Sequence, residues 1–147
     1  MSSDVELGYH FCYGDFAHRH FKEPEDTTAF VSIANGLAEG VSRPISWLHL
    51  PVPRKRTDDK YFAPMRDLRL QPGTELYLGL IHHTDGLDGA CERMRAARKV
   101  ISAFGVATEC GAGRRQTETI QELLQLHMDA LSHLQPKVQS IVEEHVA

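Results

Sequence analysis

The chain has 147 residues, the length of one ordinary domain and enough to bury a hydrophobic core. Its 16 Lys and Arg residues and 20 Asp and Glu residues give a net charge of -4, which argues against the basic surface that nucleic-acid binding needs. No apolar run is long enough to cross a bilayer, so we expect neither a nucleic-acid nor a membrane partner.

The first predicted element is a strand over residues 5–13, and Gly14 and Asp15 then break it into a loop. His10 and Cys12 lie two positions apart, so their side chains share one face of this strand. An imidazole and a thiol suit zinc better than magnesium or calcium, which prefer oxygen ligands. The alternative is that both are buried packing residues, the usual role of a free cysteine or a lone histidine in an apolar strand.

The middle of the chain continues as helix and strand. After a polar segment over residues 17–26, apolar residues at helical spacing predict a helix over 27–39. The short apolar run 45–50 predicts a second strand, which two prolines end. Residues 61–68 predict a helical turn or two, kept short by Pro64.

The third predicted strand, over 75–82, is apolar almost throughout, as in strands that are covered on both faces. An amphipathic helix follows, with an apolar stripe over 87–104 and Gly105 at its end. Residues 106–108 predict a short fourth strand, and the Gly-rich, basic segment 111–115 predicts a loop after it.

A last long helix is expected from Thr117, with its apolar stripe reaching Leu134 and Pro136 interrupting it, and a terminal helix over 138–146. Four strand–helix repeats argue for an α/β fold with a parallel sheet. They equal four β-α units of a (β/α)8 TIM-type barrel, a half barrel. Because a half barrel leaves open edges and an exposed inner face, we expect a homodimer or a separate N-terminal half-barrel as its partner.

The residues that carry chemistry gather at one end of the predicted strands. Binding and catalytic sites of parallel sheets and barrels form at the carboxyl ends of the strands. There the sequence places His10, Cys12, His49, His82, His83 and Cys110. Cys110 therefore adds a third candidate metal ligand to His10 and Cys12.

The three cysteines are an odd number and too few to staple a domain of this size. The chain also begins without the basic start and apolar run of a secretory signal. We therefore expect one domain over residues 1–147 in a reducing, cytoplasmic compartment. Cys91 falls at a core-facing helical position, which predicts a buried packing role for it.

Two motifs resemble those of the cobalamin-independent methionine synthase family, within the wider group that includes uroporphyrinogen decarboxylase. His10-Phe11-Cys12-Tyr13 with Phe16 resembles the family's His-X-Cys-Tyr zinc motif, and Cys110-Gly111 followed by Arg115 resembles its downstream Cys-Gly motif. The resemblance runs roughly over residues 7–133 and matches the C-terminal half of the catalytic barrel. It implies a zinc ion held by His10, Cys12 and Cys110, with a thiol substrate bound to it as thiolate.

The sequence departs from the family in two ways. The family completes its zinc shell with a Glu in a Glu-Thr-Ser-Arg context, whereas the matching stretch here, residues 48–54, has no carboxylate. His49 is the candidate replacement, and water or substrate is the alternative. The stretch that supplies the N-terminal half of the family's barrel has no counterpart in this sequence.

Further roles follow from the resemblance. It places an acid-base histidine at the end of the third strand, where His82 and His83 stand; the alternative is that one packs inward and the other is solvated. Asp85 and Asp15 are candidates to orient these histidines. Independently of the resemblance, Arg114 and Arg115 in the Gly-rich loop are candidates to bind a carboxylate or phosphate of a substrate, the alternative being plain surface charges. Asp15 is a further candidate substrate-binding residue.

The function that the sequence predicts is zinc-dependent methyl or alkyl transfer involving a small thiol. The alternative is a non-catalytic or incomplete half-barrel module that must pair with itself or with an N-terminal half, its metal site possibly degenerate.

Overall fold

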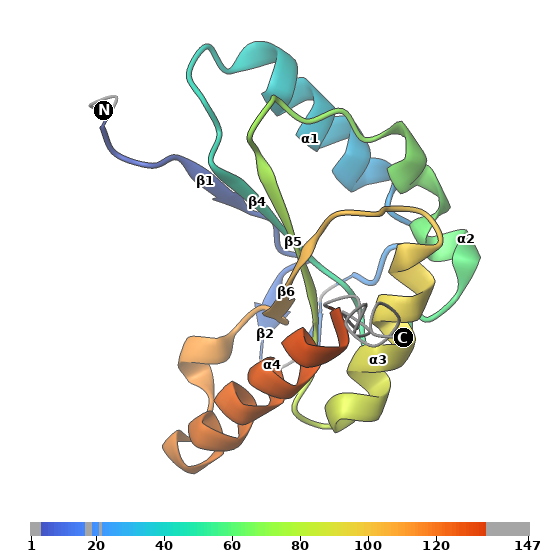
Figure 1. Ribbon diagram of the computed structural model, residues 1–147, viewed down its shortest axis with the longest axis vertical. Helices are drawn as coiled ribbons and strands as arrows, with labels where there is room; N and C mark the ends of the chain where they lie inside the picture. Colours follow the sequence, from blue (N-terminus) through green and yellow to red (C-terminus); the bar gives the residue numbers. More distant parts are fainter. Residues whose placement is uncertain (1–3, 17–18, 21, 135–147) are drawn as a thin grey trace, which may run out of the picture.

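The computed structural model describes residues 4–16, 19–20 and 22–134. Its centre is a parallel sheet of four strands that neighbour one another in chain order (Figure 1). The strands are β1 (Gly8–His10), β4 (Trp47–Pro51), β5 (Glu75–Ile81) and β6 (Gly105–Thr108). The expectation of a parallel sheet built from alternating strands and helices is confirmed.

Helical segments connect each strand to the next. They are α1 (Thr28–Gly40), α2 (Asp59–Phe62) with the 3-10 turn η1 (Ala63–Asp67), α3 (Gly86–Arg98), and, after β6, the turns η2 (Ala112–Arg114) and η3 (Thr117–Thr119) and helix α4 (Ile120–Leu134). The terminal helix expected over 138–146 lies outside the described residues. Among those residues, no helix is both long and apolar enough to span a bilayer.

The two faces of the sheet differ. Register pairs Leu48 with Leu76 and Leu50 with Leu78, and these buried side chains form the core face. Because every crossover steps the same way along the sheet and such crossovers are right-handed, the helices belong on this face. Figure 1 shows α1, α2 and α3 together on one side of the strands.

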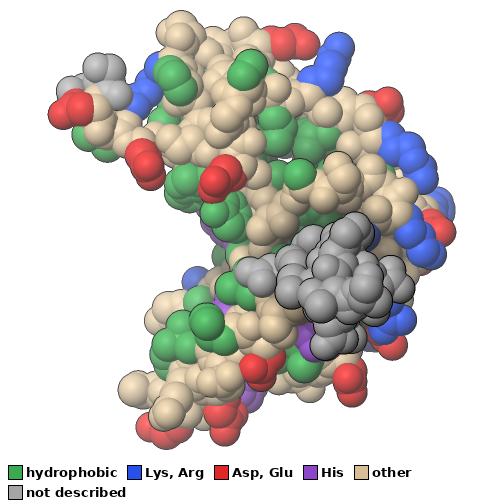
Figure 2. Space-filling view, viewed as in Figure 1, with side chains coloured by type: hydrophobic (Ala, Val, Ile, Leu, Met, Phe, Trp, Pro, Cys, Tyr) green, Lys and Arg blue, Asp and Glu red, His purple; other side chains and the backbone are tan. Residues whose placement is uncertain are grey.

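The other, open face has larger and partly exposed side chains. Register aligns His10, His49 and Tyr77 across three strands, and Trp47 lies beside Gly8. Figure 2 shows the molecule hollowed between the part that carries β1 and the part that carries α4, with hydrophobic and histidine side chains along the hollow. A parallel sheet is ordinarily covered on both faces, so this open face is unusual.

The first strand is shorter than the sequence predicts. Its ladder with β4 extends only to the bond from the Phe11 N–H to the His49 carbonyl, at 3.0 Å. Beyond that bond, the rings of Phe11 and Tyr13 pack against Phe30 in α1, with centroid separations of 5.6 and 4.7 Å. This packing draws the chain off the sheet, so Cys12 stands in a loop.

Two other expectations were wrong in detail. The third helix ends at Arg98, and Gly105 opens β6 where the sequence predicts a helix end. A Cβ at Gly105 would lie 2.5 Å from the Tyr77 ring, so the glycine lets this ring lie against β6. Two-residue strands, β2 (Asp15–Phe16) and β3 (Arg19–His20), form an antiparallel pair next to and within the segment expected to be a polar loop.

A buried arginine ties β5 to the start of α3. Arg93 is 1% exposed, and its guanidinium forms a bidentate pair with Asp85, at 2.6 and 2.9 Å. The same group donates to the carbonyls of Leu80 and Arg54, at 2.8 and 2.7 Å. A Cβ at Gly89 would lie 2.3 Å from the Asp85 carboxyl carbon, so the glycine leaves the space that the Asp85 carboxylate occupies.

Replacing Arg93 tests this ion pair. Arg93→Leu leaves the Asp85 carboxylate and two carbonyls without their donor, and we expect a loss of roughly 3 kcal/mol or more in the free energy of unfolding. Arg95→Leu, on the exposed side of the same helix, is the matched control and should change stability by less than about 0.5 kcal/mol. Equal effects of the two substitutions in urea unfolding would contradict the assignment.

Candidate metal centre

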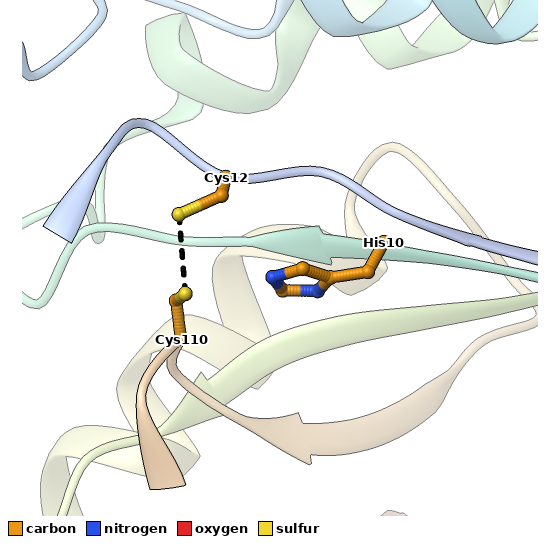
Figure 3. Close-up of side chains that lie close together, drawn as sticks. All are labelled: His10, Cys12 and Cys110. Atoms are coloured by element: carbon orange, nitrogen blue, oxygen red, sulfur yellow. Dashed lines mark hydrogen bonds between the residues drawn. The ribbon is translucent and has the colours of Figure 1, made fainter. Parts of the chain in front are cut away.

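Three side chains with metal-binding atoms converge over the open face of the sheet. Among the described residues, the ligand atoms of His10, Cys12 and Cys110 all lie within 4.8 Å of one another. His10 ends β1, Cys12 follows it by two residues, and Cys110 follows the end of β6 by two. Figure 3 shows the imidazole pointing toward the two sulfurs. The structure thus brings together the cluster that the sequence predicts.

This convergence depends on how the sheet curves. β1 and β6 are the two edge strands, with β4 and β5 between them. At about 4.8 Å per strand, three spacings in a flat sheet would separate the edge strands by roughly 14 Å. The ligand atoms meet because the strand ends lean toward each other around the open face and the side chains reach inward from both edges.

The two sulfurs are close but not bonded. Cys12 Sγ and Cys110 Sγ are 3.1 Å apart, and neither cysteine forms a disulfide. A disulfide would bring the sulfurs to about 2.05 Å. Two thiolates on one tetrahedral zinc ion, with Zn–S bonds of about 2.3 Å, would stand about 3.8 Å apart. A small movement of either loop would therefore reach the spacing that a shared ion requires.

His49 lies against the candidate ligand His10. Their Nδ1 atoms are 2.7 Å apart, and their rings stack with centroids 4.7 Å apart at an angle of 28°. Burial lowers the pKa of His10, and it lowers the pKa of His49 to about 4, with the charge of His10 adding to the effect and the Thr108 backbone opposing it. Both rings are therefore neutral at pH 7, which is the form that binds metals.

Two tyrosines and a phenylalanine hold the loop of Cys12. The hydroxyls of Tyr13 and Tyr61 are 2.8 Å apart, and Tyr61 is fully buried. Burial, together with this contact, raises the pKa of Tyr13, so its hydroxyl stays neutral. Since Phe11 and Tyr13 flank Cys12 and both pack on Phe30, the thiol is held in place from both sides.

A charged network holds the chain beside Cys110. Glu109 accepts from Arg115 and lies 2.8 Å from Nδ1 of the buried His82. The other nitrogen of His82, Nε2, lies 2.8 Å from the Val52 carbonyl. The two ring nitrogens of His82 thus hold the imidazole between the Val52 carbonyl and the Glu109 carboxylate. Glu109 was not among the predicted site residues, although its position next to Cys110 at a strand end was a signal for it.

The remaining predicted site residues have other contacts. Asp85 binds Arg93, and Arg115 binds Glu109. His83 pairs with Glu122 of α4 at 2.9 Å. Arg114 is exposed in η2. The backbone of Asp15 belongs to β2, but its side chain lies outside the part of the chain that the structure describes.

A cavity of substantial volume lies away from this cluster. It has a volume of about 710 Å³ and opens between the first residues of β5 and β6 and the end of α3, lined by Leu70, Leu76, Tyr77, Ile101 and Phe104 among others. The metal-binding side chains stand at the opposite, carboxyl ends of the strands. In barrels that end carries the chemistry, so this cavity is not the candidate site.

The pH dependence of stability tests the environment of His49. Its pKa is about 4 when folded against 6.5 ordinarily, so the unfolded chain binds more protons between these values. The stabilisation is complete above pH 6.5 and is lost as the pH falls toward 4. In metal-free protein, we expect His49 to contribute a loss of roughly 1–2 kcal/mol between pH 7 and 5. His49→Leu should flatten this part of the urea-unfolding profile; an unchanged slope would contradict the assignment.

Comparisons with known proteins do not place this chain in a family. Neither protein-family models, nor curated proteins, nor solved structures gave a match. The fold and the His10, Cys12 and Cys110 cluster are therefore the observations from which a function has to be argued.

Proposed function

We propose that this chain binds a zinc ion through His10, Cys12 and Cys110 and transfers a methyl or alkyl group in a reaction that involves a small thiol. The convergence of the three ligand atoms within 4.8 Å carries the proposal. These ligands come from opposite edges of the sheet. The two cysteines are 98 residues apart in the chain. The resemblance to the methionine synthase motifs supports the same reaction.

The donor set fits zinc. Zinc binds imidazole nitrogen and thiolate sulfur in both structural and catalytic sites, whereas magnesium and calcium prefer oxygen ligands. Three protein ligands leave a fourth position for substrate, as in catalytic zinc sites. A zinc ion at this site would promote loss of the proton of a bound thiol at neutral pH, because a thiol coordinated to zinc is a thiolate.

The surrounding residues have separate proposed roles in positioning, proton transfer and substrate binding. His82 is enclosed by Val52 and Glu109 and serves to hold the strand end beside Cys110. His83, whose side chain is 27% exposed, is the better candidate to give a proton to the leaving group. Arg114, which is exposed in η2, is the candidate to bind an anionic group of the substrate.

A second candidate function is a half-barrel module that works only when assembled. The chain order of the strands, the helices on one face and the hollow on the other favour it. A second copy would supply eight strands in total, and an N-terminal half-barrel could do the same. We expect light scattering to report a dimer; a monomer that binds no dye for apolar surface would contradict this candidate.

Metal content tests the ligand set. We expect purified protein to carry one zinc per chain and Cys12→Ser to lose most of it, because a hydroxyl is a poor replacement for a thiolate. Cys91→Ser is the matched control, since Cys91 lies in α3 and outside the cluster. Bound zinc should also slow alkylation of Cys12 and Cys110 relative to Cys91. Wild-type protein without stoichiometric zinc would contradict the proposal.

Thiol binding tests the reaction. In cobalt-substituted protein, a small thiol should add a saturable sulfur-to-cobalt charge-transfer band, whereas the matching alcohol should not. Zinc-loaded protein is then offered methyl donors with the same thiol, and S-methyl product is measured by mass spectrometry. If no thiol in the panel changes the cobalt spectrum, the proposed role in thiol chemistry is wrong.

A further inference from the structure

We propose that His49 is a positioning residue for the metal centre: it accepts a hydrogen bond from Nδ1 of His10, fixes the rotation of that ring, and is not itself a ligand. This inference rests on the proposed zinc site. The sequence left open whether His49 or a water or substrate molecule is the fourth zinc ligand. The inference assigns His49 a different role and leaves the fourth position to water or substrate.

The geometry shows the two histidines engaged with each other. The 2.7 Å separation of their Nδ1 atoms is a hydrogen-bond distance, and the rings are stacked at 28°. His10 and His49 are direct neighbours in the register of β1 and β4, so both side chains rise from the same face of the sheet. The contact is therefore set by strand pairing and does not depend on a loop.

Proton placement follows from the valence of imidazole. Two nitrogens at this distance share one hydrogen, so one Nδ1 donates and the other accepts. If Nε2 of His10 gives its lone pair to a metal, Nδ1 of the neutral ring must carry the hydrogen. His49 then accepts at Nδ1 and carries its own hydrogen at Nε2. Ligand histidines ordinarily have such a partner on their second nitrogen, and it fixes both tautomer and orientation.

The surroundings of His49 also direct it away from metal binding. Its Nε2 is buried, and a Cβ built at Gly79 would lie 3.1 Å from it and 2.9 Å from the Thr108 carbonyl oxygen. This nitrogen thus faces β5 and β6, and Nδ1 is occupied by His10. With neither nitrogen of His49 directed at the cluster, the fourth position on a metal stays open for a substrate.

Gly79 is part of the same arrangement. A side chain at this position would meet backbone atoms of Pro51 and Thr108 as well as the His49 ring, so something must shift. We expect Gly79→Ala to displace the His49 ring without removing any atom of either histidine. It therefore provides a route to the same effect that is independent of substitution at His49.

The experiment measures zinc affinity by competition with a chromophoric chelator and the ligand set by X-ray absorption at the zinc edge. The variants are His49→Leu, His49→Asn and Gly79→Ala. His133→Leu is the matched control, because His133 is an exposed histidine in α4 that lies outside the cluster. All variants are first checked for folding by circular dichroism and thermal unfolding.

We expect His49→Leu to weaken zinc binding by about 10- to 100-fold while keeping one imidazole and two sulfurs on the metal. His49→Asn, whose Oδ1 can accept in place of Nδ1, should recover most of the affinity. Gly79→Ala should weaken binding in the same direction, and His133→Leu should leave it unchanged. Nitrogen NMR of zinc-loaded protein should find the hydrogen of His10 on Nδ1 and that of His49 on Nε2.

Two results would overturn the inference. If His49→Leu removes an imidazole from the zinc shell, then His49 is a ligand; if it leaves the affinity unchanged, then His49 positions nothing. Either result leaves the zinc proposal standing. A wild-type protein that binds no zinc defeats the proposed function itself, so the two failures are distinguishable.

Discussion

The convergence of side chains from the two edges of the sheet, near the ends of β1 and β6, is the constraint on which the candidate site depends. These are the edge strands of the sheet, and His10, Cys12 and Cys110 bring their ligand atoms within 4.8 Å of one another only because the sheet curls around its open face. Curvature follows from the twist of parallel strands and from helices packed on one face alone. The candidate site is therefore a property of the whole sheet.

Each side of the cluster has its own support, and the two supports differ in kind. The side of Cys12 is held by aromatic packing on Phe30 and by the buried pair of Tyr13 and Tyr61. The side of Cys110 is held by charge, through Glu109 and its partners His82 and Arg115. Loops carry both cysteines, so these contacts replace the rigidity that a strand would have provided.

Asp85, a candidate catalytic residue from its place at a strand end, forms a structural ion pair. Asp85 follows an apolar strand and precedes a helix, the place where an active-site acid is expected, yet its carboxylate is the partner of buried Arg93. A buried arginine without its acid would destabilise the fold severely, and the four hydrogen bonds of Arg93 explain why it is tolerated. Placement at a strand end thus raises the chance of function without deciding it.

The sequence by itself determined the order of strands and helices, the parallel sheet, and the cluster of His10, Cys12 and Cys110, because hydrophobic periodicity and strand-end position are local signals. Tertiary structure alone decided the partners: Glu109 for His82, Glu122 for His83, Arg93 for Asp85 and His49 for His10. These partners are eight to 39 residues apart. No periodicity reports such a pairing, since it depends on strand register, sheet curvature and the space that Gly79 and Gly89 leave.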